Sequence, residues 1–524
     1  MKRMLSLMLA LLLLSTGVAA LAEDNFNATG YPIAKEPVTY TVLAVTNTQY
    51  ADDFNEYSAV KYFSELTNVK FEWSYFSETD WDTQINLRLA GGDIPDMIYS
   101  PLSSVQLQQY GVEGGMFLNY ADYIDEYMPN AKRAFENNPD MRSLVTMLDG
   151  GIYALPRKLW TYTMAGPIYY RGDMMEEMGA QVPTTVDEFY ALCAQAKEQY
   201  KDVEGFWPIM TNVSYLNQCL FPAFGAAWQY GYGDNGDGQV TYNLVSDQMR
   251  AYLDFVHKLY ADGMVDPEMY TMDGATINAK VKAGQCLFIG GVGTQLSADF
   301  YKSGKVETKV LPPLVSQYTD EQKVIDVPWL GYAGYTISAD CENPEYLLRY
   351  LDMFFTTIPE MENNICGISS WLGIYGTDWG ISEDGKNFFR IVPENINMAE
   401  EEYKNKYVID STYLGLVVLD LMPINNPTQE MKAGESALHY YPYMKPRLLD
   451  GNFKYTDEES SDLSGLETDI NTYVTTATAQ FISGTQELND DTWKQFVDTV
   501  NGMQLSEVLR IKQIGYDRWN GKTE

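Results

Sequence analysis

The stretch that most constrains the fold is residues 80–99, DWDTQINLRLAGGDIPDMIY, which predicts a helix, a glycine turn and a strand. Asp80 stands at the N-cap position, and the apolar residues after it recur every four positions, so they share one helical face. A glycine pair follows, and glycine readily adopts the left-handed backbone that ends a helix. The adjacent Met97 and Ile98 predict a short strand that is buried on both faces, as in a parallel sheet.

The same alternation of strand and helix precedes this stretch. Residues 38–45 are rich in β-branched side chains and predict the first strand, residues 52–66 predict an amphipathic helix, and residues 69–75 predict a second strand. This βαβαβ order predicts a parallel, doubly wound α/β lobe. Ligands of such sheets bind beyond the carboxyl ends of the strands. We therefore expect the following loops to face a cleft: residues 46–50, 76–81 and 100–103.

The chain begins with a sequence typical of a secretory signal peptide, residues 1–22. Two basic residues are followed by an apolar run, and an A-x-A site ends at Ala22, so we expect cleavage after Ala22. The apolar run is too short for a stable membrane span, and no later stretch approaches about 20 continuous apolar residues. We therefore expect a protein that is secreted or held on the extracellular side of the cell envelope.

The composition is that of a globular chain with two or three domains: 524 residues, 45% hydrophobic and 21% charged. A net charge of -36 repels nucleic acid and anionic lipid, so we expect neither as a partner. Aromatic residues make up 14% of the chain, which favours an aromatic-lined ligand surface. The five cysteines are odd in number and far apart, which argues against a disulfide framework.

The sequence carries no recognisable catalytic or metal-binding motif. His257 and His439 have no neighbour at metal-ligand spacing, and residues 234–238, DNGDG, lack the ligand order of an EF-hand. We therefore predict no metal ligand, no cofactor, no catalytic residue and no enzyme activity. Two alternatives stay open: a secreted glycoside hydrolase that uses a pair of cleft carboxylates, and a binding protein for a non-sugar solute such as a peptide.

Several motifs resemble the family 1 extracellular solute-binding proteins of carbohydrate ABC transporters, in particular their long Firmicutes-type subgroup. The run DW-x-x-Q-x-NLRLA-x-GD-x-PDM carries the clearest resemblance. DGGIYALP, YYRGDMMEEMGAQVPTTVDEF, NPEYLLRYLDMFF and IKQIGYDRWN follow in the order that the family has, over nearly all of the mature chain. Many relatives are lipoproteins with a cysteine at the cleavage point, whereas the first cysteine here is Cys193, so this chain has no lipobox cysteine.

The resemblance implies a two-lobed fold of the periplasmic-binding-protein type, with doubly wound sheets in each lobe and a hinge that the chain crosses more than once. By analogy the crossings fall near Pro156, residues 328–335 and residues 421–426. The implied division gives one lobe residues 31–155 plus 333–430 and the other residues 156–332 plus 431–524. The implied function is a monomeric receptor that captures an oligosaccharide between the lobes and delivers it to the subunits of an ABC permease.

Sugars present C–H faces that stack on aromatic rings and hydroxyl edges that hydrogen-bond to polar side chains. We therefore expect ligand contacts where aromatic and polar residues stand together in loops that face the cleft. The ligand-binding candidates are Asp80, Trp81, Asp96, Trp160, Tyr162, Arg171, Trp207, Trp228, Tyr230, Trp329, Tyr332, Trp371 and Tyr375. A structural role is the alternative for each of them: the aromatics can pack in a core, and Asp96 and Arg171 can pair at the edge of a sheet.

Overall fold

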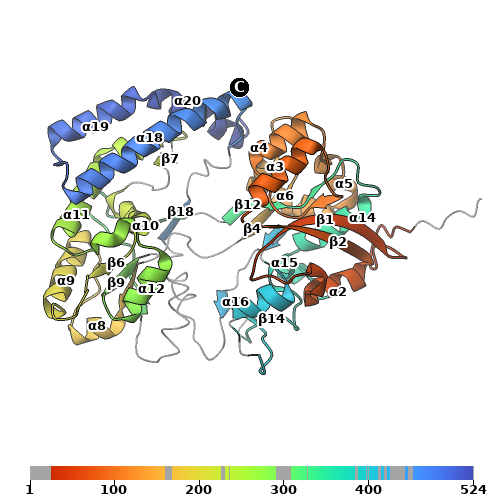
Figure 1. Cartoon of the computed structure of the whole chain (residues 1–524), viewed down its shortest axis with the longest axis horizontal. Coiled ribbons are helices and arrows are strands. Elements are labelled where there is room, and N and C mark those ends of the chain that lie inside the picture. Colours follow the sequence, from red (N-terminus) through yellow and green to blue (C-terminus); the bar gives the residue numbers. More distant parts are fainter. Residues whose placement is uncertain are drawn as a thin grey trace, which may run out of the picture.

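The computed structural model describes residues 25–159, 168–225, 231–234, 237–290, 308–326, 329–383, 387–396, 398, 400–410, 415–417, 422–424, 443–446 and 453–522. Two large hydrophobic cores divide these residues. One core takes its side chains from residues 33–155 and 330–409, and the other from residues 168–314 and 463–511. They define the two bodies seen side by side in Figure 1, which we call the first and the second lobe. Within the described residues, no helix has both the length and the apolar composition needed to cross a membrane.

The first lobe contains the sheet that the sequence predicted. Its first strands and their crossover helices are β1 (Val38–Thr46), α2 (Ser58–Thr67), β2 (Val69–Ser77), α3 (Trp81–Gly91) and β3 (Met97–Ile98). β1 pairs in parallel with both β2 and β3, so the βαβαβ prediction is confirmed. Both residues of β3 are buried, as their adjacent apolar side chains indicated.

α3 begins and ends where the sequence places it. Asp80 precedes the helix, but its carboxylate makes no capping bond and instead accepts a 2.7 Å hydrogen bond from the Ser77 hydroxyl. Gly92 ends the helix with a φ of +71°, in the left-handed region that favours glycine. Ile85 and Leu89 are buried beneath the helix, so the apolar face found in the sequence is the face that packs.

A second segment of the chain returns to complete the first lobe. β13 (Thr336–Ile337) adds to β3 as an antiparallel edge strand, and α14 (Glu345–Asp352) packs against α5 (Ile124–Tyr127) and α6 (Pro129–Asn137). The remaining helices and the small second sheet are α4 (Ser104–Gln106), α7 (Pro139–Val145), α15 (Ser369–Leu372), α16 (Glu400–Tyr403), β14 (Trp379–Ile381), β15 (Asn387–Arg390) and β17 (Met422–Ile424).

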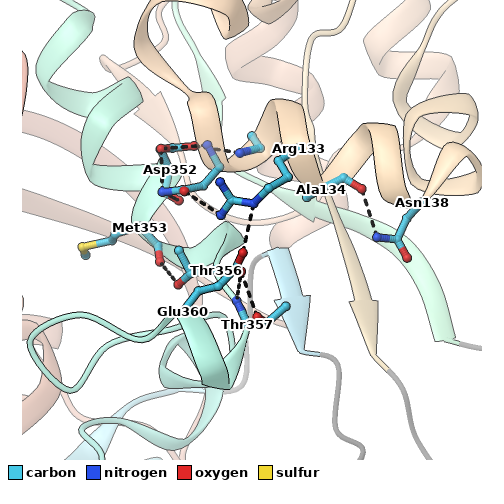
Figure 2. A network of polar contacts seen from close by, with 10 residues as sticks. Arg133, Ala134, Asn138, Asp352, Met353, Thr356, Thr357 and Glu360 are labelled. Atoms are coloured by element: carbon cyan, nitrogen blue, oxygen red, sulfur yellow. Dashed lines mark hydrogen bonds and ion pairs between the residues drawn. The ribbon is translucent and has the colours of Figure 1, made fainter.

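Asp352 ties this returning segment to α6 (Figure 2). The residue at the N-cap of α6 is Met128, whose side chain cannot accept a hydrogen bond from the first turn. The Asp352 carboxylate accepts from the backbone N–H of Ala131 at 2.8 Å and of Asn130 at 3.3 Å, and so caps the helix from another element. Its burial raises the pKa of the carboxyl to about 7.

The second lobe contains a mixed sheet in the order β10 (Thr308–Val310), β5 (Ile168–Arg171), β9 (Phe288–Gly290), β6 (Ile209–Met210). The sequence predicted a doubly wound sheet here as well, but β5 runs antiparallel to both of its neighbours and only the β6–β9 pair is parallel. A separate hairpin pairs β7 (Tyr232–Asp234) antiparallel with β8 (Val240–Tyr242).

Helices make up most of the rest of the second lobe. They are α8 (Gly172–Glu177), α9 (Val186–Gln199), α10 (Val213–Leu220), α11 (Asp247–Ala261), α12 (Gly274–Lys282), α18 (Asp457–Ser483), α19 (Asp490–Gly502) and α20 (Leu505–Trp519). The C-terminal helices α18–α20 lie together across one side of the lobe, at the top of Figure 1.

Short strands lie between the lobes (Figure 1). β12 (Trp329–Gly334) and β16 (Gly415–Val417) pair with opposite edges of β4 (Leu155–Leu159), and β11 (Val324–Asp326) pairs with β18 (Met444–Pro446). β4 and β12 fall at the first two predicted crossings. At the third expected crossing, residues 421–426, the described part is β17, which pairs with β15. The division into lobes by these crossings stays a prediction.

Candidate functional site

A cavity of about 430 Å³ lies between the two lobes. Its first-lobe wall follows the 100–103 loop, one of the loops that we expected to face a cleft. The first lobe contributes Ser104, Val105, Gln108, Gln109, Glu113, Met147 and Leu148. The second lobe contributes Phe453, Lys454, Tyr455, Asp457 and Ser460. A molecule in this cavity would therefore contact residues of both lobes at once.

Most of the first-lobe wall is formed by α4 and the π-helical turn η2 (Leu107–Glu113) that continues it, and Met147 and Leu148 complete the wall. Ser103 and Gln106 form a reciprocal capping box that starts α4. The Gln106 amide also donates to the Asn86 side chain at 2.9 Å, which ties the wall to α3. Gly111 allows the π-helical turn to lie against the Tyr153 ring, since a Cβ there would be 2.9 Å from a ring carbon. Such π-helical turns are frequent at functional sites.

Gln108 has an unusual hydrogen-bonding state in this wall. Its amide nitrogen lies 3.5 Å from the Glu113 carboxylate, and its Oε1 is buried and accepts no hydrogen bond from any described residue. A buried acceptor without a donor is costly to the folded state.

The second-lobe wall is the segment 453–455 that leads into α18. α20 holds this segment, because the Phe453 ring contacts the Tyr516 ring at 5.9 Å and Arg518 donates to the Lys454 carbonyl at 3.3 Å. Arg518 also forms an ion pair with Glu459 at 2.6 Å, and Glu459 completes the capping box that starts α18. The position of this wall thus depends on the C-terminal helix.

Lys454 lies at the base of the cavity against the strands between the lobes. Its side chain lies over the Tyr332 ring, with Nζ 4.9 Å from the ring centroid, and the ammonium donates to the Tyr332 hydroxyl. The Tyr332 hydroxyl in turn donates to the Leu144 carbonyl at 3.0 Å. Burial lowers the pKa of Lys454 to about 7 and raises the pKa of Tyr332 above its usual range.

The structure gives several of the ligand-binding candidates other contacts. Asp96 accepts hydrogen bonds from the Thr41 N–H at 2.7 Å and hydroxyl at 2.8 Å, and so holds β1. Arg171 is buried and forms a two-bonded ion pair with Asp173 at 2.6 and 2.8 Å. Asp80 accepts from Ser77, as described above.

Among the aromatic candidates, the side chains of Trp81, Trp207, Trp371 and Tyr375 pack beside other rings or buried residues. Trp81 lies near the Phe76 ring, Trp207 packs against the core of the second lobe, and Tyr375 contacts Trp379 with the ring centroids 5.0 Å apart. The Arg390 guanidinium lies 5.5 Å from the Trp371 ring centroid. Trp329 is the first residue of β12, opposite Leu159.

Tyr332 contacts a cavity residue, Lys454, but none of the candidates whose side chains are described lines the cavity itself. Trp160, Tyr162, Trp228 and Tyr230 lie outside the described residues. The ligand-binding roles of all the candidates stay predictions.

Sequence reasoning missed the residues that do line the cavity. It looked for aromatics beside polar residues, whereas the first-lobe lining is polar or aliphatic. Three of the lining residues, Gln108, Gln109 and Glu113, lie on a π-helical turn that has no recognisable sequence pattern. The one usable signal was the position of the 100–103 loop after a parallel strand.

The described residues contain no group of three or more His, Cys, Asp or Glu side chains that could hold a metal ion. In the DNGDG loop, Asp234 accepts hydrogen bonds from the Gly238 N–H and the Tyr516 hydroxyl, so it holds the hairpin against α20.

The sequence itself decides the family. Residues 47–357 match the family model described as bacterial extracellular solute-binding protein. The chain belongs to this family. Its solved neighbours include the HMO-binding, ABC-transporter-associated solute-binding protein of Bifidobacterium longum infantis, with a TM-score of 0.73 and 18% identity over 93% of this chain and 100% of that chain. The two-lobed fold is the fold of such proteins.

Two curated relatives are similar in sequence. The fructooligosaccharide ABC transporter substrate-binding protein FusA of Streptococcus pneumoniae is 24% identical, over 96% of this chain and 95% of that protein. The polygalacturonan/rhamnogalacturonan-binding protein YtcQ of Bacillus subtilis is 22% identical, over 40% of this chain and 41% of that protein. Both are binding proteins rather than enzymes.

Proposed function

We propose that this protein is an extracellular receptor that binds an oligosaccharide between its lobes and delivers it to an ABC permease for import. The observation that carries this proposal is the inter-lobe cavity, whose walls come from both lobes. Membership in the solute-binding family and the names of the two relatives support it. The proposal extends to a signal peptide that is cleaved after Ala22 and to a monomeric mature protein.

The cavity lining suits a sugar. Val105 and Leu148 are exposed apolar side chains at its edge, 60% and 39% accessible, and offer contact to the C–H faces of a ring. Amides, hydroxyls and carboxylates stand between the apolar groups and can bond to ring hydroxyls.

The two walls of the cavity belong to different lobes, so a bound ligand can favour closure of the lobes. A ligand that contacts the first-lobe wall on one side and the 453–460 segment on the other gains interactions when the lobes approach, so it shifts the population toward the closed form. The strands β4, β12 and β16 between the lobes are the proposed hinge. The proposed lobes are residues 31–155 plus 333–430 and residues 156–332 plus 431–524.

Aromatic side chains next to the hinge strands are proposed to extend the binding surface. Trp160 and Tyr162 follow β4, and Trp329 begins β12. Trp160→Ala or Trp329→Ala should weaken sugar binding about tenfold, since buried Trp contacts dominate many binding surfaces. Tyr318→Ala is the control, because Tyr318 is exposed and is not among the lining residues of the inter-lobe cavity. Equal affinities of the Trp variants and the control would remove these two assignments.

The experiment that tests the function is calorimetric titration of the mature chain against a panel of neutral and acidic oligosaccharides, with each sugar analysed for cleavage afterwards. Tight binding of intact sugar supports the receptor. Shortened sugar would favour a glycoside hydrolase instead. No binding of any sugar would contradict the proposal and turn attention to peptides and other solutes.

A further inference from the structure

The C-terminal helix α20 belongs to the second lobe, but its last side chain contacts the first. Leu505, Val508 and Ile511 of α20 lie in the second-lobe core. Trp519, the final residue of the helix, instead packs against the core of the first lobe. The C-terminal end of α20 accordingly points toward the first lobe in Figure 1. This one helix therefore has side chains in contact with both lobes.

A second contact crosses between the lobes beside this helix. Lys454 is buried, and its ammonium lies over the Tyr332 ring and donates to the Tyr332 hydroxyl. Tyr332 packs against first-lobe side chains, and its hydroxyl donates to the Leu144 carbonyl of α7 at 3.0 Å. Two consecutive hydrogen bonds thus join the second-lobe wall of the cavity to the first lobe.

Both contacts are held by the same part of the second lobe. The Trp519 and Phe453 ring centroids lie 6.3 Å apart, and Phe453 directly precedes Lys454. Arg518 donates to the Lys454 carbonyl at 3.3 Å. It also forms an ion pair with Glu459 of α18 at 2.6 Å. Trp519 and Lys454 therefore move together with α18 and α20.

These contacts belong to one arrangement of the lobes. Trp519 and Lys454 are fixed to the second lobe, whereas the surfaces that they touch are fixed to the first, so rotation of the lobes moves one past the other. In this structure a cavity of about 430 Å³ separates the two walls. Approach of the walls disrupts the contacts, because closely packed surfaces fit in discrete arrangements and do not deform continuously.

We infer that Trp519 and the Lys454–Tyr332 pair form an inter-lobe latch that stabilises this arrangement and opposes closure of the lobes. The effect of the latch on sugar binding rests on the proposed function, since the latch adds to the free energy that a bound sugar must supply to bring the walls together. Its effect on the lobes themselves requires no sugar and can be measured on the chain alone.

Single-molecule FRET on the mature chain tests the latch. Dyes on Ala283→Cys, at the end of α12, and Glu402→Cys, in α16, report the distance between the lobes. Both positions are exposed, and the five native cysteines are buried or partly buried. Trp519→Ala should shift the population toward shorter distances, because less of the latch then opposes closure. A distribution that stays at the wild-type distances or shifts to longer ones would overturn the inference.

Tyr516→Ala is the matched control. Tyr516 precedes Trp519 by three residues on α20 and also contacts the Phe453 ring, with the centroids 5.9 Å apart, but it packs against the second-lobe core. This variant should keep the wild-type distance distribution. A shift as large as that of Trp519→Ala would mean that lost support for Phe453 moves the lobes, and it would overturn the inference.

Tyr332→Phe tests the other half of the latch. The change removes the hydroxyl that links Lys454 to the Leu144 carbonyl and keeps the ring. It should shift the distance distribution in the same direction as Trp519→Ala. An unchanged distribution would remove the Lys454–Tyr332 pair from the latch.

Affinity separates the latch from the proposed function. For each sugar of the titration panel that binds the wild type, Trp519→Ala should bind about three- to tenfold more tightly, because the apparent Kd falls as the closed form becomes more populated. Unchanged or weaker affinity would contradict the opposition to closure. If no sugar binds the wild type, the proposed function fails, whereas the FRET distributions still decide whether the latch exists.

Discussion

At the scale of single residues, Asp352 shows how one carboxylate joins two distant segments. Asp352→Ala leaves the N–H groups of Asn130 and Ala131 without their acceptor, so we expect a loss of about 1–3 kcal/mol in the free energy of unfolding. Urea unfolding of the variant and the wild type measures this difference in the free energy of unfolding. Asp52→Ala changes an exposed aspartate of the same lobe and should leave stability within about 0.5 kcal/mol of wild type.

The pH dependence of this variant has a definite sign. The carboxyl pKa is about 7 in the folded protein and about 4 in the unfolded chain, so the folded state binds the proton more tightly. Wild-type stability from this residue is therefore full below about pH 4 and is lost as the pH rises toward 7. Asp352→Ala should cost more at pH 5 than at pH 8, and an equal cost at both would contradict the burial argument.

The contribution of Lys454 to stability depends on pH with the opposite sign. Its pKa of about 7 lies below the value of about 10.4 in the unfolded chain, so the folded state binds the proton less tightly and wild-type stability rises with pH between 7 and 10. Lys454→Met removes a buried charge and keeps the aliphatic side chain. The variant should therefore gain stability relative to wild type at pH 6, and the gain should shrink by pH 9. Lys201→Met, at an exposed lysine, should show no such trend in thermal unfolding.

At the scale of elements, the contact between α20 and the 453–455 segment depends on a glycine. A Cβ at Gly515 would lie 2.6 Å from the Tyr455 ring and 2.9 Å from Phe453. Gly515→Ala should therefore cost about 1–3 kcal/mol of unfolding free energy and weaken ligand binding, because the second-lobe wall must move.

Gly465→Ala in α18 is the matched control. It is the same change in a helix interior, and no atom lies within 4 Å of the added Cβ. Helix propensity predicts that it is neutral or stabilising by up to about 1 kcal/mol. Similar thermal midpoints and affinities for the two variants would show that the close approach at Gly515 is unimportant.

Local patterns allowed much of the fold to be predicted from the sequence. Apolar spacing and the glycine pair gave α3, and strand–helix alternation gave the parallel order of β1, β2 and β3. The start of α9 is not fixed by local sequence, since Thr184 and Thr185 are adjacent and only the contact with Glu188 shows that Thr185 is the cap.

The candidate site was harder to predict because its contacts join distant parts of the chain. Lys454 meets Tyr332 across 122 positions, and the tertiary fold alone brings them together. The π-helical turn that presents Gln108 depends on the packing of Gly111 against Tyr153, which no local pattern reveals. Polar lining residues also lack the periodicity that identifies core residues.

At the scale of the whole molecule, two separate cores are joined by short strands. The cores of the first and second lobes take side chains from different residues, and Trp519 of α20 packs against the core of the first lobe. Two such bodies need not unfold together. We expect calorimetric unfolding of the ligand-free chain to show two transitions, one for each lobe. Asp352→Ala should lower the midpoint temperature of the first-lobe transition, and Gly515→Ala should lower that of the second-lobe transition.

The ligand should change this behaviour, because it binds both walls of the cavity. At 100 times Kd a bound sugar adds about 2.7 kcal/mol to the state that binds it, and binding requires both lobes to be folded. A saturating concentration of the sugar ligand should therefore raise the midpoint temperatures of both transitions and bring the two midpoints closer together. If a sugar raised the midpoint temperature of only one transition, it would bind to one lobe alone. The inter-lobe cavity would then not be its binding site.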